Sequence, residues 1–248
     1  MASVIMQSII QWLEDYKIKT NCRGVVLGIS GGKDSTTVAM LAKKAWGDNV
    51  FGVMMPDGQQ GDIQDAINVC CKLHLNCATV NIGKATSDII SEVNSSIRSI
   101  DLSQKTITNI APRMRMIVLY AIAQQMGYRV IGTGNASEAY IGWTTKWGDS
   151  AYDLNPIYHL TCSEVVGLGL ELAKEFGLDE SLIVKPPCDG LTGRSDEDNF
   201  GFTYAALDKW IREGLSMESE SQDVTKIECL HKTTEHKRRM PYTTHDLL

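Results

Sequence analysis

A short polar stretch, residues 30–35, carries the residue types that bind phosphate. It reads Ser-Gly-Gly-Lys-Asp-Ser. The two glycines can adopt backbone angles closed to other residues and let a ligand approach the main chain. Both Ser hydroxyls add donors, and Lys33 adds a positive charge. The carboxylate of Asp34 would repel a phosphate unless a divalent cation bridges the two groups. The stretch therefore predicts a phosphate–metal site, and the plainer interpretation is a glycine-rich turn without a ligand.

The flanking residues predict the elements that position this stretch. Residues 25–27 are apolar and β-branched or aliphatic, which suits a buried strand. Residues 36–42 have apolar side chains at spacings of three and four, which suits a helix. The free N–H groups at the start of that helix favour an anion in the turn. We therefore expect a strand, a phosphate-binding turn and a helix in succession.

Two common phosphate loops do not fit. A Walker A loop has Gly, four residues and then Gly-Lys-Ser/Thr, whereas Gly28 is followed after four residues by Lys33 and then Asp34. The dinucleotide fingerprint needs a second glycine where Ser30 stands. The loop therefore belongs to another class of nucleotide site.

Glu138 is a second carboxylate of interest. Residues 129–133 predict a strand, and Glu138 follows in the turn at its carboxyl end, where open α/β sheets bind ligands. If this strand neighbours the first one, Glu138 faces Asp34 across the phosphate site. Two carboxylates with phosphate oxygens make a reasonable Mg²⁺ site. The alternative is a first-turn Glu favoured only by the helix dipole.

The rest of the chain alternates between predicted strands and helices. We predict strands at 25–27, 50–55, 78–82 and 129–133, and helices at 3–17, 36–46, 62–74, 86–97, 109–127, 162–176, 204–213 and 223–231. Residues 99–108 are expected as a polar connection and 184–199 as a long exposed loop. This order predicts one α/β domain over 1–248, with an open, doubly wound parallel sheet and helices on both faces.

Composition narrows the class of protein. The 248 residues are 43% hydrophobic, which suits one domain with a sizeable core. The formal net charge of −6 gives no basic surface for nucleic acid. No apolar run approaches the ~20 residues of a membrane span, and the N-terminus lacks the basic start of a signal peptide. Seven cysteines without regular spacing favour reduced thiols. We expect a cytoplasmic protein with neither nucleic-acid nor membrane partners.

Several motifs carry a resemblance to a known family. Residues 30–35 match the Ser-Gly-Gly-x-Asp-Ser loop of the ATP pyrophosphatase superfamily, whose members split ATP between the α and β phosphates. Residues 132–138 (Gly-Thr-Gly-Asn-Ala-Ser-Glu) and 145–149 (Thr-Lys-Trp-Gly-Asp) resemble the NAD synthetase family. Residues 109–113 and 234–238 resemble its Asn-Ile-x-x-Arg and Glu-His-Lys-Arg elements. The similarity runs in order from about residue 3 to 242.

The resemblance implies an adenine nucleotide alpha hydrolase-like fold and an ammonia-dependent ligase. Such enzymes amidate deamido-NAD with ammonia and ATP, through an adenylated intermediate, and release NAD, AMP and pyrophosphate. It also implies a homodimer with the dinucleotide at the subunit interface, which agrees with the largely apolar residues 109–127.

The resemblance assigns site residues as well. ATP would contact Gly28, Ile29, Ser30, Gly31, Gly32, Lys33, Asp34, Ser35 and Thr133. Deamido-NAD would contact Arg113, Lys146, Asp153, His236 and Lys237. Asp34 and Glu138 would bind Mg²⁺, and Asp149 would lie near the ammonia. Catalysis would fall to Ser30, Lys33 and Asp149.

Two positions depart from the family pattern, and one domain is not expected. Cys162 stands where the pattern places a Lys on ATP, and Cys188 stands where it has Thr or Ser. A glutaminase domain needs well over about a hundred residues and a Cys nucleophile. The synthetase motifs fill this chain, so we expect free ammonia as the donor, although a separate glutaminase subunit stays open.

Three other hypotheses about the function remain open from the sequence alone. A tRNA-modifying ATP pyrophosphatase would want a basic face and paired cysteines, and the chain has no Cys-x-x-Cys. A zinc module could use Cys70, Cys71, His74 and Cys77, which lie close together but lack zinc spacing. A regulatory ATP-binding protein that has lost catalysis is the third, and Cys162 is the feature that favours it.

Overall fold

A computed structural model describes residues 2–58, 63–97, 99, 101–186, 195–214 and 222–241. Its strands are β1 (Val25–Gly28), β2 (Val50–Met54), β3 (Asn76–Thr79) and β4 (Arg129–Val130). The first helices are α1 (Ala2–Thr20), α2 (Lys33–Trp46), α3 (Ile63–Lys72), α4 (Gly83–Ser96), α5 (Gln104–Thr108) and α6 (Ile110–Met126). They are followed by α7 (Ala136–Ile141), α8 (Cys162–Phe176), α9 (Ser181–Val184), α10 (Asp196–Phe200), α11 (Tyr204–Glu213), α12 (Gln222–Thr233) and the 3₁₀ turn η2 (Glu235–Lys237).

The four strands form one parallel sheet in the order β3-β2-β1-β4. In the central pair, Val25 lies opposite Val50 and Gly28 opposite Val53. The predicted pairing of the first strand with the one before Glu138 is confirmed, because β4 lies beside β1. The carboxyl ends of β1 and β4 therefore bring the phosphate loop and α7 to the same edge of the sheet.

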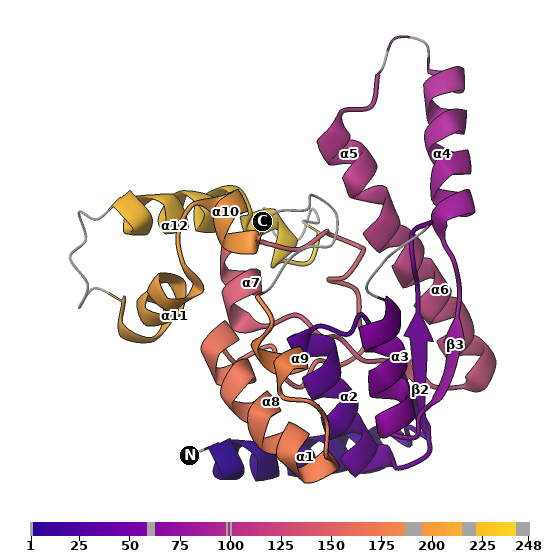
Figure 1. Cartoon of the computed structure of the whole chain (residues 1–248). Coiled ribbons are helices and arrows are strands. Elements are labelled where there is room, and N and C mark those ends of the chain that lie inside the picture. Colours follow the sequence, from indigo (N-terminus) through magenta and orange to yellow (C-terminus); the bar gives the residue numbers. More distant parts are fainter. Residues whose placement is uncertain are drawn as a thin grey trace, which may run out of the picture.

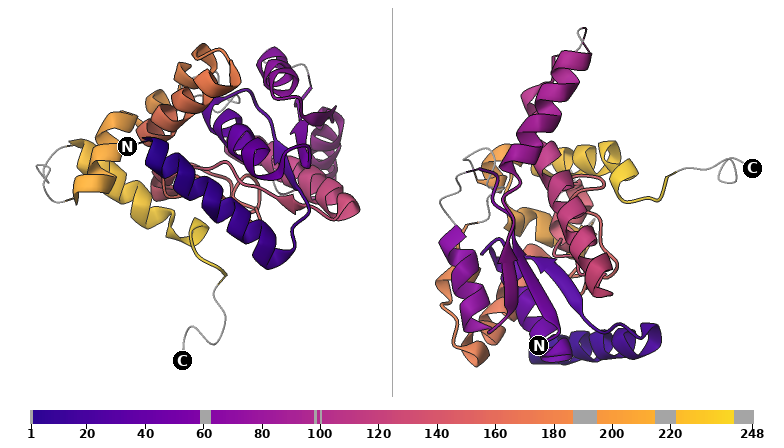
Figure 2. Two further views of the ribbon diagram at one scale, coloured as in Figure 1. Left: turned by 90° about the horizontal axis from the view of Figure 1, so that it is seen from below. Right: turned by 90° about the vertical axis from the view of Figure 1, so that its right-hand side faces the viewer.

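Helices cover both faces of the sheet, as Figures 1 and 2 show. Val25 and Leu27 of β1 face one buried cluster, which α1, α2, α3 and α8 complete. Val26 faces the other cluster, which includes Ala111 and Ala123 of α6. This alternation along a strand buried on both sides is what a doubly wound sheet requires. The predicted fold class is confirmed.

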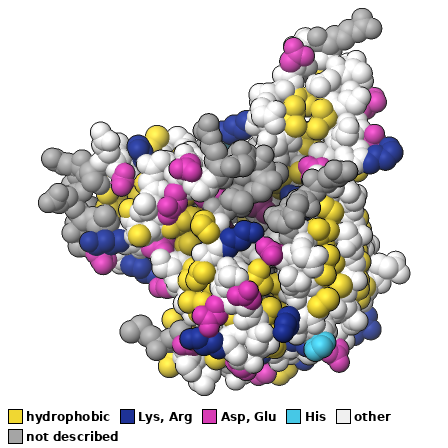
Figure 3. All heavy atoms as spheres, viewed as in Figure 1, with side chains coloured by type: hydrophobic (Ala, Val, Ile, Leu, Met, Phe, Trp, Pro, Cys, Tyr) yellow, Lys and Arg dark blue, Asp and Glu magenta, His cyan; other side chains and the backbone are white. Residues whose placement is uncertain are grey.

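A third cluster lies beside the sheet and joins α7, α10, α11 and α12. It includes Phe200, Leu207 and Ile227. In Figure 1 this group lies to the left of the sheet, and α4 and α5 project above the sheet. Figure 3 shows hydrophobic side chains on that projecting part, and acidic and basic side chains interspersed over the body. No helix in the described part of the chain is long and apolar enough to cross a membrane.

For two strands, the bounds predicted from the sequence are wrong. The third strand covers Asn76–Thr79 rather than 78–82, because it is an exposed edge strand with polar residues and the apolar residues follow it. The fourth ends at Val130 rather than 133. Beyond it, Ile131 bridges to Leu154, and the Gly132 N–H donates to the Leu154 carbonyl, so the segment around Leu154 continues the sheet only as an isolated bridge.

Two predicted connections contain helices. Residues 104–108 form α5, which Ser103 caps by accepting a hydrogen bond from the Thr106 N–H. Asn109 lies at the start of α6 as predicted but does not cap it with its side chain. Its amide instead donates to the Lys105 carbonyl and its oxygen accepts from Thr145. Within 184–199, residues 196–200 form α10, whereas 187–194 lie outside the described residues.

Candidate active site

The phosphate loop is a hydrogen-bonded turn between β1 and α2. The Gly32 N–H donates to Ser30 Oγ over 3.2 Å, the Ser30 and Ser35 hydroxyls lie 3.0 Å apart, and the Ser35 hydroxyl donates to the Gly32 carbonyl over 3.1 Å. Gly31 has φ of +81°, which favours glycine. A Cβ there would lie 2.6 Å from the Asp65 Cβ, so α3 packs directly against the turn. These contacts fix the shape of the turn at the start of α2.

Lys33 and Asp34 form a nearly buried ion pair in the first turn of α2. The Lys33 Nζ lies 2.6 Å from Asp34 Oδ2, and the two side chains are 4% and 17% exposed. Burial opposes the Lys33 charge most strongly, but Asp34 and the neighbouring Glu138 and Cys162 together outweigh burial and raise the Lys33 pKa. The ammonium therefore stays charged inside the site, where a phosphate group would meet it.

Asn135 joins the phosphate loop to α7. Its side-chain amide donates to Asp34 Oδ1 over 3.1 Å, and its backbone N–H donates to Glu138 Oε2 over 3.1 Å. Its own side-chain oxygen accepts from the Glu138 N–H, which completes a capping box at the start of α7. Asn135 is fully buried. It fixes the orientation of both carboxylates that the sequence proposed as metal ligands.

The residues present fit a magnesium ion. Burial, followed by the Asp34 charge, raises the pKa of Glu138 to about 8, so a cation between the two carboxyl groups would favour the charged form of Glu138. Among the described residues, no group of three or more His, Cys, Asp or Glu side chains could hold a metal ion by itself. Mg²⁺ is typically held by one or two carboxylates together with substrate phosphates. The same finding speaks against a zinc site at Cys70, Cys71, His74 and Cys77.

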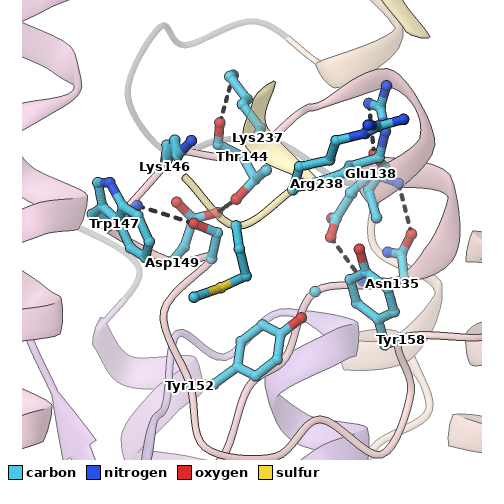
Figure 4. A pocket seen from close by; sticks show the side chains of 15 residues that line it. Asn135, Glu138, Thr144, Lys146, Trp147, Asp149, Tyr152, Tyr158, Lys237 and Arg238 are labelled. Carbon is cyan, nitrogen blue, oxygen red and sulfur yellow. Dashed lines mark hydrogen bonds between the residues drawn. The ribbon is translucent and has the colours of Figure 1, made fainter. Parts of the chain in front are cut away.

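A cavity of about 230 Å³ opens next to Glu138 and Asn135. Figure 4 shows Glu138 and Arg238 at one side, Lys146 and Trp147 at the other, and the rings of Tyr152 and Tyr158 below. Asp149 and Lys237 also line the cavity. The Lys146 ammonium lies 5.5 Å from the centre of the Trp147 ring, and Trp147 has φ of +61°, an uncommon backbone angle for a large residue. Aromatic and cationic groups therefore line one continuous space beside the phosphate loop.

Asp149 is held in the cavity wall by two donors from its own loop. Its Oδ2 accepts from the Thr144 hydroxyl and its Oδ1 from the Thr145 N–H, each over 2.7 Å. The loop itself is anchored by Lys237, whose ammonium donates to the carbonyls of Gly142 and Thr144 over 2.7 and 2.6 Å. Each carboxylate oxygen of Asp149 retains a lone pair, so it can accept a further proton or hydrogen bond.

The model of one protein family, NAD synthase, matches residues 5–241. The chain belongs to the NAD synthase family. The NH(3)-dependent NAD(+) synthetase of Mycoplasmopsis pulmonis is 38% identical over 243 residues, which cover 97% of this chain and 90% of that protein. The structure of NMN synthetase from Francisella tularensis superposes with a TM-score of 0.87 at 31% identity over 98% of both chains. NH3-dependent NAD synthetase from Campylobacter jejuni superposes with a TM-score of 0.78 at 28% identity over 98% of both chains.

In this NAD synthase family member, most of the predicted site residues lie around the cavity and the phosphate loop. Lys146, Asp149 and Lys237 line the cavity together with Glu138. Arg113 donates to the Lys146 carbonyl over 3.3 Å, and Lys146 donates to the His236 carbonyl over 2.5 Å. The segment from η2, the loop of Lys146 and the start of α6 are thus brought together. The predicted contacts of these side chains with a nucleotide stay predictions.

Asp153 and Thr133 are the predicted site residues that remain to be placed, together with the two cysteines that depart from the family pattern. Asp153 is not among the residues that line the cavity: its Oδ2 accepts from the Val130 N–H over 2.7 Å, at the edge of β4. Thr133 lies between β4 and α7, and its contact with ATP stays a prediction. Cys162 begins α8 and is buried, and burial raises its pKa to about 12. Its N–H donates to the Ser137 hydroxyl. Cys188 lies outside the described residues.

Sequence reasoning missed several residues of the site. The capping-box pattern Asn-x-x-Glu at 135–138 could have singled out Asn135. Arg238 lines the cavity and donates to the carbonyls of Ala139 and Tyr140, which ties the last turn of α7 to the segment after α12. No local pattern marks Tyr152 or Tyr158, because a sequence does not reveal which loop aromatics point into a cavity.

Proposed function

We propose that this chain catalyses the ATP-dependent amidation of deamido-NAD by ammonia, as an NH3-dependent NAD+ synthetase. One observation carries the proposal. A single cavity extends from Glu138 and Asn135, which lie against the phosphate loop through Asp34, to Asp149 and Lys146. A carboxylic acid in that cavity could meet the α-phosphate of ATP at one end and ammonia at the other. The names of the curated relatives support the same activity.

In the first step, the nicotinate carboxylate attacks the α-phosphorus of ATP and pyrophosphate leaves. The N–H groups at the start of α2 and the Ser30 hydroxyl would orient the phosphates. The charge on the leaving pyrophosphate would be offset by the buried Lys33 ammonium. Mg²⁺, held by Asp34 and Glu138 in this proposal, supplies further charge neutralisation when bound. The product of this step is an acyl adenylate.

In the second step, ammonia attacks the acyl carbon and AMP leaves. Asp149 would accept a proton from ammonium, since the Thr144 hydroxyl and the Thr145 N–H orient its carboxylate and each of its oxygens retains a lone pair. Water in the cavity would hydrolyse the adenylate, so the aromatic walls serve to limit its access. The two steps together consume deamido-NAD, ATP and ammonia and produce NAD, AMP and pyrophosphate.

Free ammonia is the proposed nitrogen donor. The curated relatives in this comparison are named NH(3)-dependent, and the chain covers 90% of the Mycoplasmopsis pulmonis protein and 89% of the Pyrococcus furiosus protein. The synthetase motifs occupy the described chain from the phosphate loop to η2. No glutaminase domain is needed for the proposed reaction.

We also propose a homodimer and a cytoplasmic location. Along α6, only Ala111 and Ala123 are buried, and Ile117 is 51% exposed in the single chain, although the helix is largely apolar. A second copy would cover that face, and sedimentation velocity at micromolar concentration tests this. Six cysteines among the described residues are free thiols, which suits a reducing compartment.

A second candidate function is the amidation of nicotinate mononucleotide to NMN. It is favoured by the TM-score of 0.87 with NMN synthetase from Francisella tularensis, against 0.78 with the Campylobacter jejuni NAD synthetase. The two acids share the nicotinate ring and ribose phosphate and differ in the adenylate half. Both would present the same carboxylate to ATP.

A product assay tests the proposal and separates the two candidates. The purified protein is supplied with Mg²⁺-ATP, ammonium chloride and either acid, and NAD or NMN, AMP and pyrophosphate are measured together. We expect NAD in a 1:1 ratio to AMP, with kcat/KM for deamido-NAD above that for the mononucleotide. A higher value for the mononucleotide would select the second candidate. Absence of pyrophosphate from folded protein would support a regulatory protein instead.

A further inference from the structure

Tyr204 is a buried aromatic residue beside the phosphate loop. It begins α11, about 170 residues after that loop in the sequence, and is 5% exposed. The Lys33 Nζ lies 5.7 Å from the centre of its ring. That distance is within the range in which an ammonium is attracted to an aromatic face. The Asp34 carboxylate and this ring are both neighbours of the Lys33 ammonium, and Glu138 and Cys162 act on its charge as well.

Contacts with α10 fix the orientation of the ring. The Tyr204 hydroxyl donates to Asp196 Oδ2 over 2.9 Å, and its backbone N–H donates to Glu197 Oε1 over 2.7 Å. The Phe200 ring meets it edge-on, with ring centres 5.4 Å apart. The side chain therefore has little freedom to turn away from Lys33.

One turn later on the same helix, Asp208 clamps α11 to the elements of the active site. Its Oδ1 accepts from the Ser137 hydroxyl over 2.5 Å. Its Oδ2 accepts from the Ser163 N–H and hydroxyl over 2.8 and 2.6 Å. Asp208 is 7% exposed, and Ser137 directly precedes Glu138. Residues four apart share a helix face, so this clamp sets the place of Tyr204.

We propose that Tyr204 is a positioning residue that holds the Lys33 ammonium toward the pyrophosphate end of the ATP site. This inference rests on the proposed function. In the structure, Lys33 points to Asp34, the same carboxylate that is proposed to bind Mg²⁺. Once Asp34 shares its charge with a cation, Lys33 needs another neighbour to stay in place. An aromatic face attracts the ammonium without neutralising it, so its charge remains available to the leaving pyrophosphate.

Equilibrium binding of Mg²⁺-ATP tests the inference. It is measured by calorimetry for the wild-type chain, Tyr204→Phe and Tyr204→Leu, each with and without Lys33→Met. We expect Tyr204→Leu to weaken binding about 3- to 30-fold, the value of a desolvated cation–aromatic contact. Tyr204→Phe keeps the ring and should bind within about twofold of the wild-type chain. In the Lys33→Met background, Tyr204→Leu should have no further effect.

A matched control separates positioning from stability. Trp210→Leu removes another buried aromatic residue from α11, in the same cluster, whose indole N–H donates to Tyr140 and Glu228 rather than lying near Lys33. It should lower the melting temperature yet leave ATP affinity within about twofold. If Tyr204→Leu fails to fold, Tyr204→Met fills the space without an aromatic face and carries the same expectations.

Two results would overturn the inference: an unchanged affinity in Tyr204→Leu, or an equal loss with and without Lys33. Either would leave the proposed function intact, because the wild-type chain would still bind ATP. Failure of the folded wild-type chain to bind Mg²⁺-ATP would instead contradict the proposed function itself. The two failures are therefore distinguishable.

Discussion

Replacing Lys33 with Met should lower kcat/KM for ATP by about 10²–10³-fold, the usual effect of removing one group that stabilises a developing charge. The Lys33 ammonium is nearly buried and lies 2.6 Å from Asp34, at the start of α2 where the phosphates would bind. Met has a similar length and no charge, so the packing of the site is largely retained. The effect should appear in steady-state rates of pyrophosphate release.

The control for this variant is Lys44→Met on the same helix. Lys44 forms an ion pair with Glu175 at the protein surface, away from the phosphate loop. The Lys44→Met substitution should lower the free energy of unfolding by at most about 1 kcal/mol and leave the rate of pyrophosphate release unchanged. If Lys33→Met retains kcat/KM for ATP within about threefold, Lys33 is not a phosphate ligand and the proposed first step fails.

Glu138→Gln should raise the Mg²⁺ concentration needed for half-maximal rate by about 100-fold. Replacing a residue that only supports a metal ligand typically lowers metal affinity about 10–100-fold. Replacing a direct ligand should therefore lower the affinity by about 100-fold. Gln at this position can still accept the Asn135 N–H and keep the capping box, so the free energy of unfolding should change by less than about 1 kcal/mol. A Mg²⁺ titration of the initial rate measures the effect.

The chain offers a matched control in α8. Glu164 completes a second capping box, with Thr161, at the same helix position as Glu138 in α7. It also pairs with Arg212 and lines no cavity described above. Glu164→Gln should leave the Mg²⁺ requirement unchanged. An unchanged requirement in Glu138→Gln as well would remove Glu138 from the metal site.

The layered architecture could be predicted from the sequence because buried strands and helices leave recognisable apolar patterns. β1 and β2 are apolar runs, and α8 and α11 follow the predicted boundaries because Thr161, Thr203 and Gly177 mark their ends. The edge strand β3 was misplaced because it is polar and exposed. The sequence extends the fourth strand to residue 133, whereas β4 ends at Val130, whose N–H donates to the distant Asp153 carboxylate.

In the candidate site, too, one part could be predicted from the sequence and another could not. The phosphate loop is contiguous, so its residue types and spacing were sufficient to find it. Two features depend on contacts between residues more than 100 positions apart: the bond of Asn135 to Asp34, and the approach of Tyr204 to Lys33. Only the folded chain brings them together. Asp153 accepts a hydrogen bond from the Val130 N–H at the edge of the sheet, and its contact with the substrate stays a prediction.

The central claim is that a carboxylate is activated by AMP before ammonia attacks it. The most direct test supplies deamido-NAD labelled with ¹⁸O at both carboxylate oxygens, together with Mg²⁺-ATP and ammonium, and measures the isotope in the products by mass spectrometry. The proposed reaction transfers one ¹⁸O atom to AMP for each NAD formed, since the bond between the carboxylate oxygen and phosphorus is retained in AMP. AMP without ¹⁸O would contradict the adenylated intermediate and with it the proposed mechanism.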